Sequence, residues 1–198
     1  MSEPSPINLP PITGPTLDQC DFILGGYMRT WGNVEVAMSE TIRKLLDTDM
    51  TTSQIVIRAL DNMHTQRELA AELGKHRLGN ADMKTLEGLL DRVKANSTRR
   101  NRIVHGKWML SLEMGTIPNP KPLTAKSAKW LRIYMPSQQG DIQTLMSGKS
   151  QKLDSAYKFW PEQIAQYANA ASALAKEVER FSKFVALKPP RIPLPVDW

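Results

Sequence analysis

Apolar residues recur at steps of three and four along four stretches of the chain, the spacing that places side chains on one face of a helix. The first stretch predicts a helix over residues 17–46, and the second begins at the candidate capping residues Thr51 and Thr52 and runs to Arg77. A third stretch opens after Asn80, and a fourth begins at Pro161, because proline is favoured in the first turn of a helix. The inward-facing positions are Ile23, Tyr27, Trp31, Val34, Met38, Ile42 and Leu45, then Val56, Leu60, Met63 and Ala70, then Met83, Leu86, Leu90 and Val93, then Ile164, Tyr167, Ala171, Leu174, Val178, Phe181 and Val185. Four amphipathic helices of this length predict a bundle.

Residues 109–160 depart from the helical period. Alternating segments at 112–117 and 130–135 predict two short strands, and a third extended piece is expected at 157–160. The predicted fold class is therefore mainly α, a four-helix bundle with a small β-hairpin insertion between the third and fourth helices. Proline-rich ends at 1–16 and 187–198 predict an extended arm and tail, which leaves 17–186 as one helical domain.

Composition removes several classes of protein. No run approaches the roughly 18 apolar residues of a membrane-spanning helix, and the first residues lack the basic and apolar stretches of a secretion signal, so we expect a cytoplasmic protein without a membrane partner. The single cysteine, Cys20, cannot form an internal disulfide and makes a thiolate zinc site unfavourable. His64 and His76 lie twelve residues apart, too far for one metal site without a further ligand. We therefore expect no metal and no cofactor.

The net charge of +6 is concentrated in two places. Residues 91–107 hold six basic residues and one acidic residue, and residues 121–133 hold four basic residues and none that are acidic. Clustered cations favour a polyanion such as nucleic acid, although solvated lysine and arginine also serve solubility.

The apolar stripe of the third helix breaks after Val93. Steps of four and three lead to Ser97 and then to Arg100 or Asn101, so either the helix ends at 96–98 and restarts, or the polar groups face a cleft. On a continuous helix, Asn101 and His105 are neighbours four residues apart, flanked by Arg100. On the first helix, Glu35 could meet Arg100 or lie at the bundle edge, and the edge is favoured.

The segment Arg100-Asn101-x-x-x-His105, late in the third predicted helix, resembles the arginine, polar residue, spacer, histidine motif of the HEPN superfamily. The resemblance implies an all-α fold and metal-independent endoribonuclease activity of the kind found in toxins and antiphage or stress systems. It also implies a homodimer in which two motifs face each other. RNA is then the substrate, and a cognate antitoxin or regulatory partner is a further candidate.

These residue types suit RNA cleavage by the 2′-hydroxyl. His105 can exchange protons near neutral pH, the guanidinium of Arg100 can hold a phosphate by two hydrogen bonds, and Asn101 can orient either group. The flanking cations are expected to bind neighbouring phosphates: Arg99, Arg102 and Lys107.

The same residues also suit a helix C-terminus. Cations in the last turn complement the helix dipole, and Gly106 could adopt the left-handed conformation of a cap. Under that interpretation the chain is a non-catalytic helical interaction protein. An RNA-binding module without chemistry is a third hypothesis, and it depends only on the two basic segments.

Overall fold

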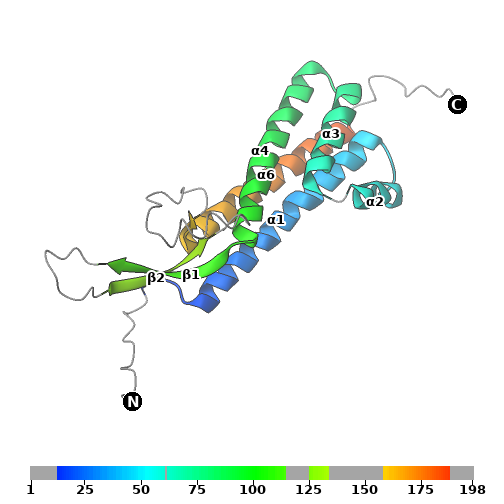
Figure 1. Cartoon of the computed structure of the whole chain (residues 1–198). Coiled ribbons are helices and arrows are strands. Elements are labelled where there is room, and N and C mark those ends of the chain that lie inside the picture. Colours follow the sequence, from blue (N-terminus) through cyan, green and yellow to red (C-terminus); the bar gives the residue numbers. More distant parts are fainter. Residues whose placement is uncertain (1–12, 61, 115–124, 134–157, 188–198) are drawn as a thin grey trace, which may run out of the picture. The chain divides into compact units, whose positions relative to one another are not determined.

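A computed structural model of the chain describes residues 13–60, 62–114, 125–133 and 158–187 (Figure 1). This part of the chain is mainly helical and carries a small antiparallel sheet. Its elements are α1 (Leu17–Leu46), α2 (Met50–Ala59), α3 (Met63–Arg77), α4 (Asn80–Val104), β1 (Lys107–Met114), β2 (Ala125–Ile133), β3 (Lys158–Phe159) and α6 (Pro161–Ala186).

The described residues form two compact units. The first contains residues 13–25, the segment from 102 to 114, both later strands and residues 158–165. The second contains residues 26–101, apart from position 61, and residues 166–187.

The first unit is built on the sheet β1-β2-β3. Lys107 of β1 pairs with Ile133 of β2, and the neighbouring Arg132 pairs with Phe159 of β3. The prediction of three short strands is confirmed, but β1 begins at Lys107 rather than at 112, soon after the end of α4, and β2 begins at Ala125 rather than at 130. Residues 115–117 and 134–135, which were also predicted to be strand, lie outside the described residues. The buried apolar side chains of this unit are Cys20, Ile103, Leu131, Phe159 and Ile164.

The second unit is helical, and its core follows the predicted stripes. The predicted positions that are buried lie on α1, α3, α4 and α6, and they are Tyr27, Trp31, Val34, Met38, Ile42, Leu45, Ala70, Leu86, Leu90, Val93, Ala171, Leu174, Val178, Phe181 and Val185. Other positions predicted to face inward are only half-buried: Ile23 of the first unit, and Val56, Leu60, Met63, Met83 and Tyr167. Helix α3 packs closely against α4, where a Cβ added at Gly74 would lie 2.6 Å from Leu86 Cδ2. Gly74 therefore allows the close approach of the two helices.

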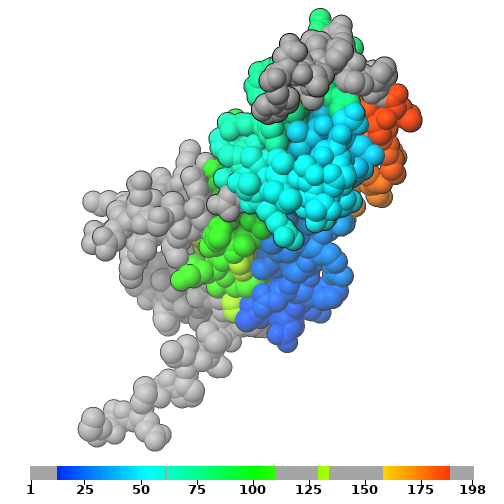
Figure 2. Space-filling model, turned by 90° about the vertical axis from the view of Figure 1, so that its right-hand side faces the viewer, coloured from blue at the N-terminus to red at the C-terminus, as the bar shows by residue number. Residues whose placement is uncertain are grey.

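Helices α1 and α6 confirm the predicted spans, but the predicted second helix is wrong. Its residues form two helices, α2 and α3, each with its own N-cap. Asp49, rather than Thr51 or Thr52, caps α2, and its Oδ1 accepts hydrogen bonds from both threonine amides at 2.7 and 3.0 Å. Asn62 caps α3 by accepting from the amides of His64 and Thr65 at 2.9 and 3.0 Å. A second set of side-chain caps starts a new helix where the apolar period alone predicted continuation. Helix α2 lies on the surface shown in Figure 2, where it is cyan.

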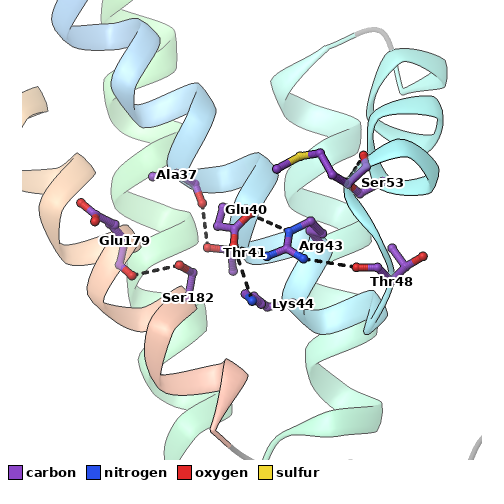
Figure 3. A network of polar contacts seen from close by, with 10 residues as sticks. Ala37, Glu40, Thr41, Arg43, Lys44, Thr48, Ser53, Glu179 and Ser182 are labelled. Carbon is purple, nitrogen blue, oxygen red and sulfur yellow. Dashed lines mark hydrogen bonds and ion pairs between the residues drawn. The ribbon is translucent and has the colours of Figure 1, made fainter.

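Polar groups at the C-terminal end of α1 are satisfied locally (Figure 3). Arg43 donates to both carboxylate oxygens of Glu40 at 2.6 and 2.8 Å and to the carbonyl of Thr48 at 3.3 Å. The hydrogen bond from Arg43 lowers the pKa of Glu40. The buried hydroxyl of Thr41 donates to the carbonyl of Ala37 at 2.9 Å. Buried polar side chains in this region therefore keep hydrogen-bond partners.

Candidate functional site

Helix α4 continues without a break through residues 96–98, so the alternative in which it ends and restarts there is wrong. Ser97, Arg100 and Asn101 share one helical face and line a polar cleft of about 730 Å³ in the second unit. One wall comes from α1 and another from the start of α3, together with one side chain of α2. The other described residues that line the cleft are Trp31, Glu35, Ser39, Ile57, Asn62, Met63, His64 and Gln66.

Arg100 enters this cleft without a carboxylate partner. Its Nη1 donates to Asn101 Oδ1 at 3.0 Å, whereas its buried Nε has no hydrogen-bond partner. Among the described residues, no aspartate or glutamate oxygen forms an ion pair with this guanidinium. A half-buried guanidinium that no carboxylate neutralises can bind an anion, and its planar fork suits a phosphate or carboxylate.

Glu35 lies on the opposite wall, one turn after Trp31 on α1. Its side chain is exposed, as expected for the bundle edge. The described residues Glu35 and Arg100 do not form an ion pair. The indole Nε1 of the buried Trp31 donates to Glu35 Oε1 at 2.6 Å. The carboxylate is thus held at the cleft by a side chain fixed in the core. The sequence placed Glu35 one turn from Trp31, but it did not indicate this hydrogen bond.

Tyr27 lies close to two cations, Arg99 and Arg100. Its hydroxyl is buried without a hydrogen-bond partner, and burial raises its pKa to about 12 although Arg99 and Arg100 act in the opposite direction. A neutral phenol therefore remains near Arg100 at all physiological pH values, and it does not cancel the charge of the guanidinium.

The remaining residues of the motif are placed differently. His105 is exposed and immediately follows α4, and it is not one of the described residues that line the cleft. Arg99 packs its guanidinium 4.3 Å from the centre of the Tyr167 ring on α6 and donates to Asn96 at 3.3 Å. Arg102 is half-buried, and Lys107 is exposed at the start of β1. The structure therefore brings Arg100 and Asn101 into one cleft and gives Arg99 a packing role.

The end of α4 is capped by Arg132 from β2. Its Nε donates to the carbonyl of Ile103, and its Nη2 donates to that of Val104 at 3.0 Å. The same guanidinium lies 5.1 Å from the centre of the Trp108 ring, and its burial lowers the pKa of Arg132.

The expected left-handed glycine cap is wrong, because Gly106 has no positive φ. Instead, Gly106 allows the backbone after α4 to lie close to Arg132 and Ile133 of β2. A Cβ there would lie 3.0 Å from Arg132 Cγ and 3.1 Å from the carbonyl oxygen of Ile133.

His64 was not expected in the cleft, since the predicted single helix gave no turn at this point. The N-cap Asn62 starts a new helix and places the first turn of α3 at the cleft wall. The imidazole is held from both sides: Nε2 lies 3.2 Å from Glu68 Oε1, and Nδ1 lies 3.2 Å from Arg67 Nη2. The described residues contain no cluster of three or more histidine, cysteine or acidic side chains that could hold a metal ion.

Comparison with protein-family models, with curated proteins and with solved structures finds no match to this chain. Within the described ranges, none of the helices has the length and apolar character needed to cross a membrane.

Proposed function

We propose that this protein is a HEPN-like, metal-independent endoribonuclease that uses Arg100, Asn101 and His105. The observation that supports this proposal is the polar cleft that Arg100 and Asn101 line together, where none of the described carboxylates forms an ion pair with the guanidinium. An RNA phosphate can fill this cleft because it supplies the negative charge that the described side chains do not place on Arg100. The longer helices would then form the four-helix bundle of such proteins.

In the proposed reaction, Arg100 binds the scissile phosphate and stabilises the charge that develops on its oxygens. Asn101 orients the phosphate or the histidine ring, and His105 transfers a proton. Arg102 and Lys107 bind flanking phosphates, to which Arg99 adds charge from its position on Tyr167. We further propose a homodimer that joins two motifs. Such a protein would act on cellular RNA as a toxin or antiphage component under the control of an antitoxin or regulatory partner.

The test is cleavage of a labelled RNA in the presence of a chelator. Wild-type protein should release fragments that end in a 2′,3′-cyclic phosphate, identified by mass spectrometry. Arg100→Ala and His105→Ala should each reduce the rate by about 10²-fold or more. Lys94→Ala is the matched control, because Lys94 is an exposed cation on α4 that does not line the cleft. Undiminished cleavage by both active-site variants contradicts the proposal.

An interaction protein without chemistry is a second candidate, and a groove of about 680 Å³ between α1 and α2 favours it. Val36 and Met50 line this groove with 70% and 56% of their surfaces exposed, and Ile55 of α2 is 66% exposed. Apolar patches of this kind are typical of partner surfaces. Under this function, or that of a simple RNA-binding module, RNA would acquire no new ends. For the RNA-binding module, affinity would fall steeply with added salt.

A further inference from the structure

The cleft that contains Arg100 carries opposite charges on two of its walls. Among the described residues that line it, Glu35 of α1 is the one acidic side chain, and Arg100 of α4 is the one arginine or lysine. Neither forms an ion pair with the other or with any other described residue. Both belong to the second unit. A ligand that fills this cleft should therefore be negative at the Arg100 end and rich in hydrogen-bond donors at the Glu35 end.

We infer that this cleft binds a guanine nucleotide of the substrate RNA, with the phosphate at Arg100 and the base at Glu35. The inference rests on the proposed function, which places an RNA phosphate at Arg100. The cleft volume of about 730 Å³ lies within the range of small-molecule sites, which is roughly 300–1,000 Å³. The cleft is therefore large enough for one nucleotide.

Guanine suits Glu35 because two hydrogen-bond donors lie side by side on its Watson–Crick edge. Its N1–H and its N2 amino group can donate to the two oxygens of one carboxylate. Adenine and cytosine instead place one amino donor beside a ring nitrogen that accepts, and uracil places its N3–H between two carbonyl oxygens. An ionised carboxylate only accepts, so it leaves those acceptors unpaired and disfavours the three other bases.

Trp31 holds the Glu35 carboxylate at the cleft. Its indole is only 2% exposed, and its Nε1 donates to Glu35 Oε1 at 2.6 Å. Glu35 also borders the groove between α1 and α2, but Trp31 is not among the described residues that line that groove, so this hydrogen bond directs the carboxylate toward the cleft. Oε1 keeps a second lone pair, and Oε2 accepts no hydrogen bond from the described residues. Both oxygens are therefore available to a base, and a carboxylate that is already ordered loses less entropy on binding.

The remaining walls suit the rest of a nucleobase. Ile57 of α2 and Met63 of α3 line the cleft with half-buried apolar side chains, which can contact the face of a flat ring. Gln66 of α3 also lines it, and its carboxamide can donate to the O6 oxygen of guanine. The cleft thus combines an apolar surface for the ring with polar groups for its edge.

The first experiment measures the affinity of the full chain for four nucleoside 5′-monophosphates by isothermal titration calorimetry. Guanosine monophosphate should bind more tightly than the adenosine, cytidine and uridine monophosphates by roughly 5- to 150-fold, the effect of one bidentate contact to a base. Inosine monophosphate lacks the N2 amino group and should lose part of this advantage. Equal affinities, a preference for another base, or no binding of guanosine monophosphate overturns the inference.

The second experiment repeats the titrations on three variants. Glu35→Gln keeps an oxygen that can accept from Trp31 but replaces the other acceptor with a donor, so the preference for guanosine over adenosine monophosphate should fall toward one. Arg100→Ala should weaken all four nucleotides to a similar extent, because they share the phosphate. Glu87→Gln is the matched control, since Glu87 is an exposed carboxylate on α4 outside the cleft, and it should keep the wild-type preference. Circular dichroism melts should show that all three variants remain folded, and an undiminished guanine preference in Glu35→Gln overturns the inference.

The third experiment separates this inference from the proposed function. An RNA pool of random sequence is treated with the protein, and the new ends are sequenced. Guanosine should be enriched beside the cut in wild type, and the enrichment should decrease in Glu35→Gln. Cuts without a guanosine preference on either side overturn the inference and leave the proposed function standing. Selective binding of guanosine monophosphate without any cleavage overturns the proposed function and leaves the guanine site standing.

Discussion

Arg132 offers the most direct test of how the first unit holds the end of α4. Arg132→Met keeps an unbranched apolar side chain but removes the hydrogen bonds to the carbonyls of Ile103 and Val104. Hydrogen bonds from a charged donor contribute about 1.5–3 kcal/mol each. Two effects reduce the loss: the amide of Gly106 still donates to the carbonyl of Ile103 at 3.3 Å, and the buried guanidinium no longer has to be desolvated. We therefore expect a net destabilisation of about 2 kcal/mol.

The assay is urea unfolding followed by circular dichroism. In a thermal melt, the same loss of about 2 kcal/mol would lower Tm by roughly 4–8 °C for a chain of this size. Lys129→Met on the same strand is the control, because Lys129 is exposed and should change stability by less than about 0.5 kcal/mol. If Arg132→Met unfolds with the same free energy as the control, the capping argument is refuted.

Three further outcomes concern the second unit. Gly74→Ala should lower the unfolding free energy by about 1–3 kcal/mol in urea titrations, because its Cβ would lie 2.6 Å from Leu86 Cδ2; equal stability would show that this contact relaxes freely. The hydrogen bond from Arg92 lowers the pKa of Glu177 in the folded protein. This exposed pair should contribute about 0.2–1 kcal/mol to the free energy of unfolding. The contribution should be complete above the ordinary glutamate pKa of about 4.3 and should be lost as the pH falls through the lower pKa of the folded state. A double-mutant cycle measured across that pH range tests this sign, and a coupling that grows toward acid would contradict it. Tyr27→Phe should leave stability unchanged or raise it at neutral pH, because the buried hydroxyl has no hydrogen-bond partner. In the wild type, stability should fall between about pH 10 and 12, because the phenol ionises at a lower pH in the unfolded chain than in the folded protein. Tyr27→Phe should abolish this loss. A clear destabilisation of that variant at neutral pH would reveal a hydrogen bond to the hydroxyl.

The helices with the longest apolar stripes could be predicted from sequence to their ends. For α1 and α6 the stripe persists over about six turns, from Ile23 to Leu45 and from Ile164 to Val185, and Pro161 marks the start of α6. The break between α2 and α3 was missed because the apolar spacing continues through Leu60 and Met63, while the side-chain cap of Asn62 decides the local conformation. The Asp-Asn pair at 61–62 was the available indication.

The contacts that stabilise two helix ends could not be predicted, because they come from arginines distant in sequence. Arg77 of α3 donates to the carbonyls of Lys44 and Leu45 at the end of α1, and Arg132 does the same for α4 from β2. Local propensity contains no information about such contacts, since the donor follows the helix end by about 30 residues.

The candidate site could likewise be predicted from the sequence only in part. The polar interruption at Ser97, Arg100 and Asn101 was visible as a break in an apolar stripe. The groups that face it from other helices, Glu35 and His64, depend on tertiary packing and on the turn before α3.

The turn that separates α2 from α3 also has a consequence for how the protein can diversify. Its cap, Asn62, is exposed, and so is His64 in the first turn of α3, whereas the opposing wall is anchored on the fully packed Trp31. Replacements on the exposed wall can alter the shape and polarity offered to a ligand while the interior stays intact. Ligand preference and thermal robustness should therefore vary independently among natural or engineered versions of this chain.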